Sequence, residues 1–230
     1  MASIKSIEIN QYRGIKKLNV SDFSKIKIPM DLMYSSEIPN NVSAILLGSG
    51  FGRNQQNIDV AWDFIKQFSC NDKCSFVFDA DIFYYQKLPL LLQELKNQQV
   101  ILTPHPKELF YLLKLYDIKV DSVEEVIQNR FEFCKLFSEK NPNCVLVSKG
   151  AITYICHQNQ IFICDVGSVA LAKAGSGDVL AGMCLSLLAQ GYDCVKAAQT
   201  AVYAHGIAAS KCETNYGLTP SKLISLIKNK

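Results

Sequence analysis

The sequence lacks the features that mark several specialised classes of protein. It has no internal repeat, no low-complexity tract and no apolar run near the ~20 residues that a helix needs to span a bilayer. Its net charge of +3 is too small to favour nucleic acid or an anionic membrane as a partner. Charged side chains interrupt the first twenty residues, so they lack the apolar segment of a signal peptide. We therefore expect a cytoplasmic protein with neither kind of partner.

A disulfide framework is missing too, although the chain contains nine cysteines. The count is odd and the spacing is irregular, which is typical of reduced thiols. Cys70 and Cys74 have no second pair nearby, which argues against a zinc site. The chain has 49% apolar and 20% charged residues, as in an ordinary globular protein, and nothing in it resembles a linker. We predict one domain, 1–230.

The chain does contain a repeated pattern, in which an apolar run is followed by a polar turn and then by a segment with helical periodicity. This order predicts an α/β fold with a mostly parallel sheet, because each run reads as a buried strand followed by a helix. We also expect a short strand at 4–9 and loops from there to residue 41. Buried strands are predicted at 42–47, 75–78, 99–102 and 144–148, a β-hairpin at 152–156 and 160–164, and helices near 58–68, 89–96, 109–115, 123–138, 179–188, 194–211 and 221–227.

Each predicted parallel strand ends in a polar or glycine-rich turn. In open α/β sheets, ligands bind at the carboxyl ends of the strands. The sequence therefore predicts that polar clusters far apart along the chain converge on one crevice.

The segment 171–183, LAKAGSGDVLAGM, is the strongest candidate for a ligand site. Gly175, Ser176 and Gly177 form a turn of small residues before an apolar helix, and the free N–H groups at such a helix start favour a phosphate group. Asp178 follows this turn, where its carboxylate has two interpretations. It is a helix N-cap, or it is a general base that takes a proton from a substrate hydroxyl.

Two further turns carry candidate residues with equally open interpretations. The turn at 48–53, GSGFGR, either brings backbone close to a ligand or is a tight entry into a helix. Asp79 and Asp81 follow the strand 75–78, where paired carboxylates suit Mg²⁺ and a single one suits a helix cap. His105 lies between Pro104 and Pro106, which restrict the local backbone and hold the imidazole in one place.

Other polar residues have a structural explanation beside the functional one. Lys149 and Gly150 follow a buried strand, where they meet a nucleotide or form a surface turn. Glu108 opens a helix, and the helix dipole alone favours its charge. His205 lies in an alanine-rich helix and is interpreted as a packed or capping residue.

Taken together, these segments resemble the NAD(P)H-hydrate dehydratases, a branch of the ribokinase-like superfamily. The resemblance covers about residues 42–226 and implies a three-layer α/β/α fold. The combination is specific, although each segment alone is not. The segments are GSGFGR at 48–53, FDAD at 78–81, LTPHPKEL at 102–109, VSKGAIT at 147–153 and LAKAGSGDVLAGM at 171–183.

The resemblance implies that the substrate is NADH or NADPH hydrated at a ring double bond, and that ADP or ATP with Mg²⁺ supplies a phosphoryl group. It makes Asp178 the catalytic base and makes the N–H groups of Gly175, Ser176 and Gly177 the anion hole. By the same resemblance, the hydrated dinucleotide is held by Gly50, Gly52, His105 and Asp178, and the adenine nucleotide by Lys149, Gly150, Ala151, Ile152, Thr153 and Gly177.

The chain also departs from the family pattern. Family members usually begin with a strand, a glycine-rich turn and an alanine-rich helix that have no counterpart here, so we take the chain to be truncated at its N-terminus. An asparagine that commonly precedes the LAK segment is replaced by the residues at 166–168. The family further implies a homo-oligomer or an epimerase domain, fused or associated. Two rival functions stay open: a ribokinase-like small-molecule kinase and a non-catalytic nucleotide-binding remnant.

Overall fold

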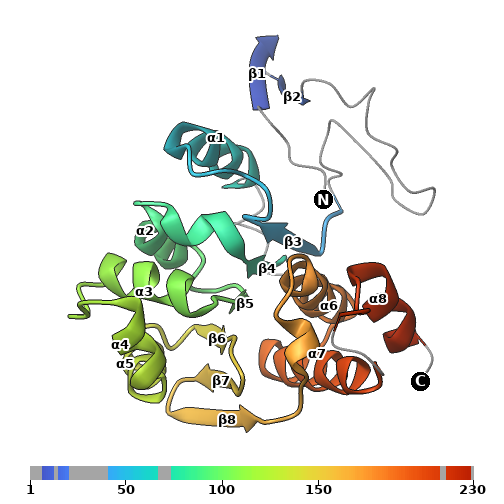
Figure 1. The fold of residues 1–230 in the computed structure, drawn as a ribbon. Helices are drawn as coiled ribbons and strands as arrows, with labels where there is room; N and C mark the ends of the chain where they lie inside the picture. The colour runs from blue at the N-terminus through green and yellow to red at the C-terminus, as the bar shows by residue number, and fades with distance from the viewer. Residues whose placement is uncertain (1–6, 13–14, 21–40, 67–73, 213–215, 229–230) are drawn as a thin grey trace.

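A six-stranded sheet forms the centre of the computed structural model, which describes residues 7–12, 15–20, 41–66, 74–212 and 216–228. Its strands follow one another in space in the order of the chain (Figure 1). The first four pair in parallel and the last two form an antiparallel hairpin, as the sequence predicts. The strands are β3 (Ala44–Leu47), β4 (Ser75–Phe78), β5 (Val100–Leu102), β6 (Cys144–Ser148), β7 (Thr153–His157) and β8 (Gln160–Cys164).

Helices cover both faces of this sheet and complete the three-layer arrangement (Figure 1). One layer contains α1 (Gln55–Ile65), α2 (Leu88–Glu94), α3 (Pro106–Leu115), α4 (Val123–Gln128) and α5 (Arg130–Lys140). The other contains α6 (Ser176–Ala189), α7 (Cys194–Ser210) and α8 (Pro220–Lys228). Short 3₁₀ turns lie at η3 (Ala80–Tyr84) and η4 (Val169–Leu171). Across the ranges that the structure describes, no helix has both the length and the apolarity to cross a membrane.

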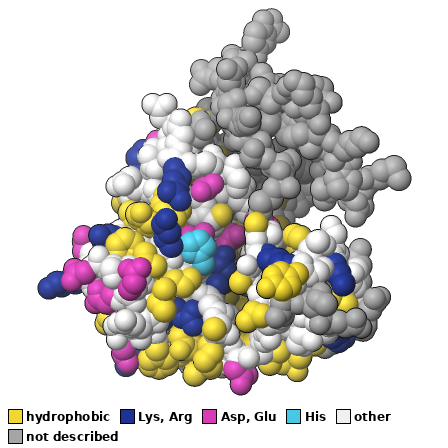
Figure 2. Space-filling model, in the orientation of Figure 1, with side chains coloured by type: hydrophobic (Ala, Val, Ile, Leu, Met, Phe, Trp, Pro, Cys, Tyr) yellow, Lys and Arg dark blue, Asp and Glu magenta, His cyan; other side chains and the backbone are white. Residues whose placement is uncertain are grey.

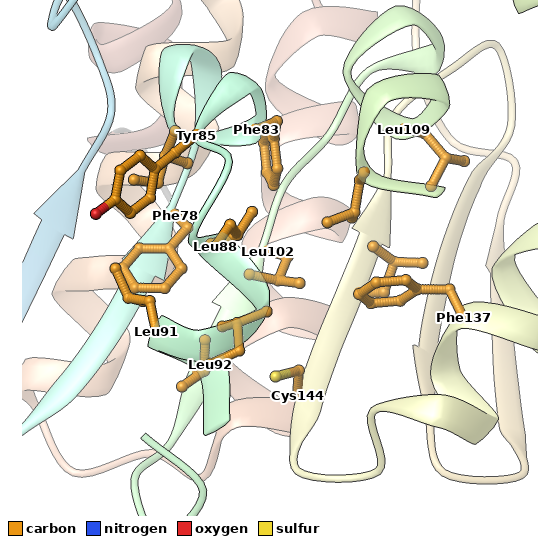
Figure 3. Close-up of a cluster of buried hydrophobic side chains, with 14 of the residues drawn as sticks. Phe78, Phe83, Tyr85, Leu88, Leu91, Leu92, Leu102, Leu109, Phe137 and Cys144 are labelled. Carbon is orange, nitrogen blue, oxygen red and sulfur yellow. The ribbon is translucent and has the colours of Figure 1, made fainter. Parts of the chain in front are cut away.

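The unbroken apolar runs are explained by burial on both faces of the sheet. Successive residues of a strand point to opposite sides. Phe78 and Leu102 pack among the helices of the first layer with Phe83 and Phe137 (Figure 3). Val77 packs on the opposite face, against α6 and α7. A parallel strand covered on both sides therefore shows no polar alternation in its sequence.

The N-terminal region differs from the prediction of loops up to residue 41. β1 (Ile7–Tyr12) pairs with β2 (Ile15–Val20) in an antiparallel ladder of its own. Lysines at the positions opposite Asn10 and Gln11 interrupt the apolar alternation that would predict β2, but backbone pairing does not depend on that alternation. The predictions for 4–6 and 21–40 lie outside the described residues.

The single helix predicted at 123–138 is wrong, because Asn129 divides it into α4 and α5. Its φ of −113° and ψ of 25° are not helical. Its side-chain amide donates to the carbonyl of Glu125 at 3.4 Å, which is the kind of local bond by which asparagine competes with helix continuation. The break gives Arg130 the first position of a new helix.

Two helical glycines are predicted to respond in opposite directions to alanine. A Cβ at Gly182 in α6 meets open space, so Gly182→Ala should raise the free energy of unfolding by about 0.5–1 kcal/mol through the lower entropy of the unfolded chain. A Cβ at Gly206 in α7 would overlap the carbonyl oxygen of Val166, so Gly206→Ala should lower it by about 2 kcal/mol. Urea unfolding of both variants measures the difference. Equal effects would contradict the packing described here.

Candidate functional site

The carboxyl ends of three strands meet at one buried ion pair. Lys149, which follows β6, lies with its Nζ 2.7 Å from Oδ1 of Asp79, which follows β4. Thr103, which follows β5, donates its hydroxyl to the same oxygen at 2.7 Å. The first turn of α6 reaches the same place, since a Cβ built on Gly177 would lie 3.3 Å from Lys149 Nζ. The convergence that the strand ends predict is therefore confirmed.

The charges in this cluster are shielded from water. The side chains of Asp79 and Lys149 are 3% and 19% exposed, and the Glu108 carboxylate lies 3.8 Å from the same ammonium. Burial of a charge is costly unless it is paired, so these three groups depend on one another. The result is a fixed ammonium beside the start of α6.

The turn before α6 exposes backbone donors. Gly175 is the N-cap with a φ of +88°, a left-handed conformation that glycine adopts without steric cost. The N–H of Ser176 donates to the carbonyl of Lys173 at 3.3 Å, and its hydroxyl donates to the same oxygen at 2.9 Å. Ser176 thus closes the turn from within. In the described part of the chain, the N–H groups of Gly177 and Asp178 have no acceptor, so they remain open to an anion.

Asp178 is exposed at the third position of α6. The N-cap interpretation is wrong for this residue, because Gly175 occupies the cap. Within the residues that the structure describes, the Asp178 carboxylate forms no hydrogen bond or ion pair. An unpaired carboxylate beside two open N–H groups is suited to accept a proton from a bound hydroxyl group.

His205 supports the same turn from α7. Its Nε2 lies 3.0 Å from the carbonyl oxygen of Ser176, and the side chain is buried. Burial lowers the pKa of this imidazole, so the neutral ring donates its Nε2 proton to the carbonyl. The packed or capping role expected for His205 is therefore a hydrogen bond that supports the turn before α6.

His105 is held by its own helix start more than by the flanking prolines. It is the N-cap of α3, where its Nδ1 accepts from the N–H groups of Lys107 and Glu108 at 3.1 and 3.2 Å. Glu108 in turn accepts from the His105 N–H at 2.8 Å and lies 3.0 Å from Nε2. This reciprocal capping box fixes the tautomer and leaves the ring 45% exposed. The three-residue spacing of His105 and Glu108 is the sequence signal of this capping box, which the helix dipole alone does not indicate.

The glycine turn after β3 is anchored to the segment after β4. Gly48, with a φ of +118°, has no room for a Cβ, which would overlap the carbonyl oxygen of Asp79. Asp81 accepts from the N–H of Gly52 at 2.9 Å. Gly50 and Gly52 also have positive φ, and a Cβ on either would meet open space. These two glycines are thus accessible, while Gly48 is a packing requirement.

Asp79 and Asp81 have different protein partners. Between them, Ala80 has a φ of 56°, which directs one carboxylate to Lys149 and the other to the glycine turn. No group of three metal-ligating side chains occurs within the described ranges. A role of either carboxylate toward Mg²⁺ therefore stays a prediction that would involve water or nucleotide phosphates as further ligands.

The segment 149–153 is secured by a residue that the sequence did not single out. Arg130 donates from Nη1 to the Lys149 carbonyl at 2.8 Å and from Nη2 to the Ile152 carbonyl. Its guanidinium packs against Gly150, where a Cβ would overlap it. The turn therefore has a fixed shape from Lys149 to Ile152, with Ala151 inside it and Thr153 directly after it. Only the fold brings Arg130 here, since nothing near it in sequence signals the contact.

Comparison with solved structures first assigns the fold. The chain superposes on a ribokinase-like superfamily protein from Enterococcus faecalis with a TM-score of 0.62 and 23% identity, over 80% of this chain and 61% of that one. A Bacillus subtilis ADP/ATP-dependent NAD(P)H-hydrate dehydratase, co-crystallized with ATP/Mg²⁺, gives a TM-score of 0.65 and 26% identity, over 81% and 62%. The fold is that of the ribokinase-like superfamily.

Comparison of sequences then assigns the family. The profile of the NAD(P)H-hydrate dehydratases matches residues 13–230, and the chain belongs to this family. It is 46% identical to the Helicobacter pylori bifunctional NAD(P)H-hydrate repair enzyme Nnr over 200 residues, which are 87% of this chain and 40% of that protein. It is 28% identical to the Neisseria meningitidis ADP-dependent (S)-NAD(P)H-hydrate dehydratase, over 86% and 64%. The chain thus spans less than two thirds of these relatives.

The ion pair makes a quantitative prediction for stability. Lys149→Met leaves the Asp79 carboxylate buried without a counter-charge and should lower the free energy of unfolding by about 3 kcal/mol. Adding Asp79→Asn should restore a large part of this loss. A double-mutant cycle measured by denaturant unfolding gives the coupling. Additive losses would show that the two charges do not depend on each other.

The acid sensitivity of folding should include a contribution from His205. Because its pKa is lowered in the folded protein, only the unfolded chain takes up this proton once the pH falls below the ordinary value near ~6.5. The free energy of unfolding should then fall by up to about 1.4 kcal/mol per pH unit. His205→Gln keeps a donor for Ser176 but cannot titrate, so its stability curve should be flatter between pH 7 and 5. Parallel curves would contradict the neutral buried ring.

Proposed function

We propose that this chain catalyses the nucleotide-dependent dehydration of hydrated NADH and NADPH. Membership of the family supports this reaction. The single observation that carries it is the exposed, unpaired carboxylate of Asp178 next to open backbone N–H groups at the start of α6. A site with a base and an anion cradle side by side is suited to phosphoryl transfer onto a hydroxyl group.

The proposed reaction solves the problem of a poor leaving group. Hydroxide leaves slowly, so the ring hydroxyl is first phosphorylated by ADP or ATP while Asp178 takes its proton. The ring nitrogen then expels inorganic phosphate as its lone pair forms a double bond to the carbon that carried it. Loss of a proton from the adjacent ring carbon restores NADH or NADPH. The oxygen of the added water leaves in the phosphate.

The neighbouring residues have separate parts in this proposal. In this proposal the N–H groups of Gly175, Gly177 and Asp178 face the transferred phosphoryl group, where preorganised donors stabilise developing charge. The Ser176 donors are bonded within the turn and hold its shape, so Ser176 does not contribute to the anion hole. Lys149 adds a positive charge beside Gly177.

Substrate and nucleotide occupy opposite sides of this centre in the proposal. Gly50, Gly52 and His105 hold the hydrated dinucleotide, and the segment 149–153 with Gly177 holds the adenine nucleotide. The accessible glycines and the fixed imidazole support the first assignment, and the turn secured by Arg130 supports the second. Mg²⁺ enters this scheme with the nucleotide phosphates, because the protein ligands present do not form a cage for it.

Asp178→Asn is the decisive variant for this proposal. The amide has the shape of the carboxylate but cannot accept the proton, so kcat should fall by about 10²- to 10⁴-fold. Return of NADH absorbance from NADH hydrate, with Mg²⁺ and ADP or ATP, measures the reaction. Asp117→Asn is the matched control, because Asp117 is exposed, has a φ of 53° that asparagine tolerates, and lies at the end of α3.

Product analysis separates the rival functions. A phosphorylated substrate that accumulates without NADH would indicate a kinase. Nucleotide binding without turnover, unchanged in Asp178→Asn, would indicate a binding protein. Full activity of Asp178→Asn would overturn the role of the carboxylate.

A further inference from the structure

An arginine lies on an aromatic side chain beside the glycine turn, and its guanidinium has no hydrogen-bond acceptor among the residues that the structure describes. Arg53 is exposed and its guanidinium carbon lies 3.8 Å from the ring centre of Tyr84. The Tyr84 ring contacts Tyr111 of α3, with ring centres 4.6 Å apart. We call Arg53, Tyr84 and Tyr111 the arginine shelf.

The backbone under the shelf is held by a glutamine. The side-chain amide of Gln55 donates to the carbonyls of Arg53 and Tyr84 at 3.3 and 3.1 Å, and its oxygen accepts from the Gln86 N–H at 2.9 Å. These bonds join the glycine turn to η3 and fix the backbone of Arg53. Ring stacking then restricts where its guanidinium lies.

The Arg53 donors have no internal anion to satisfy them. No carboxylate forms an ion pair with Arg53 in the described stretches of the chain. Two acidic groups of the neighbouring elements have other partners, Asp81 the Gly52 N–H and Glu108 both His105 and Lys149. Arg130 provides the contrast, since its Nη1 and Nη2 atoms both donate to backbone carbonyls.

The shelf adjoins two of the segments proposed to hold the hydrated dinucleotide, the turn with Gly52 and the start of α3 with His105. Arg53 directly follows Gly52, and Tyr84 contacts Tyr111 of α3, the helix whose N-cap is His105. Figure 2 shows this face, where Lys and Arg side chains lie next to the exposed histidine. If the nicotinamide ring lies between Gly52 and His105, the groups attached to it would pass over the Arg53 guanidinium.

We propose that the arginine shelf binds the phosphate groups of the dinucleotide substrate, beyond the ring that reacts. This inference rests on the proposed function for the identity of the ring. A planar guanidinium with free N–H groups pairs with phosphate through two parallel hydrogen bonds, and its stacking on Tyr84 reduces the freedom lost on binding. Contacts to a non-reacting part of the substrate raise affinity, so the shelf acts on KM.

The test compares a substrate with phosphate groups and one without. Arg53→Gln should raise the KM for NADH hydrate about 10- to 100-fold, which is the usual worth of charge-assisted hydrogen bonds, with kcat nearly unchanged. The KM for hydrated reduced nicotinamide riboside, which carries no phosphate, should not change. Lys114→Gln removes another exposed cation, one that lies over the Phe110 ring at 4.5 Å, and serves as the control.

Direct binding separates this inference from the proposed function. Binding of NADH, followed by its fluorescence, should weaken in Arg53→Gln, and the weakening should shrink as salt screens the phosphate contact. NADH binding through Arg53 without any dehydration would overturn the proposed function and leave the shelf in place. Equal losses with NADH hydrate and the riboside hydrate, or no loss with either, would overturn the shelf while dehydration stands.

Discussion

The ion pair between Lys149 Nζ and Asp79 Oδ1 joins the ends of β4 and β6 beside the first turn of α6. Thr103 adds the end of β5 through its hydroxyl, and Glu108 adds the start of α3 through its nearby carboxylate. Because the Asp79 and Glu108 carboxylates are buried and Lys149 is half-buried between them, loss of the ammonium would leave the carboxylates without a counter-charge. This cluster of charges therefore holds the first turn of α6 in place, together with its open N–H groups and the exposed Asp178.

Much of this edge was predictable, because strand ends and glycine turns have strong local signals. The run 75–78 is apolar throughout and ends in FDAD, so β4 and its carboxylates follow from the sequence. The same holds for Lys149 after β6 and for the turn before Asp178. In each case one short segment contains both the element and the residue that it presents. The fold and the residues at this edge of the sheet therefore follow from the sequence.

The contacts that shape the site were less accessible, because they join distant segments. Arg130 lies 19 residues from the carbonyl that it holds at Lys149, and Asp81 lies 29 residues from the Gly52 N–H. His205 was expected to pack or cap, but its acceptor, Ser176, was not evident. The break at Asn129 depends on one side-chain bond within a stretch of otherwise helical pattern. Such contacts follow from tertiary structure, which periodicity does not encode.

The sheet is built in chain order, from β3 to β8, and this has a consequence for how the protein folds. Each strand pairs with the one before it in the chain, so these pairings close shorter loops than pairings between distant strands would. Helix α6 is different, since it packs on β3 and β4 at the far end of the sheet. Its docking closes a loop of more than a hundred residues and must come late. We therefore expect the sheet to form before α6 places Asp178 and its turn at the edge of the sheet.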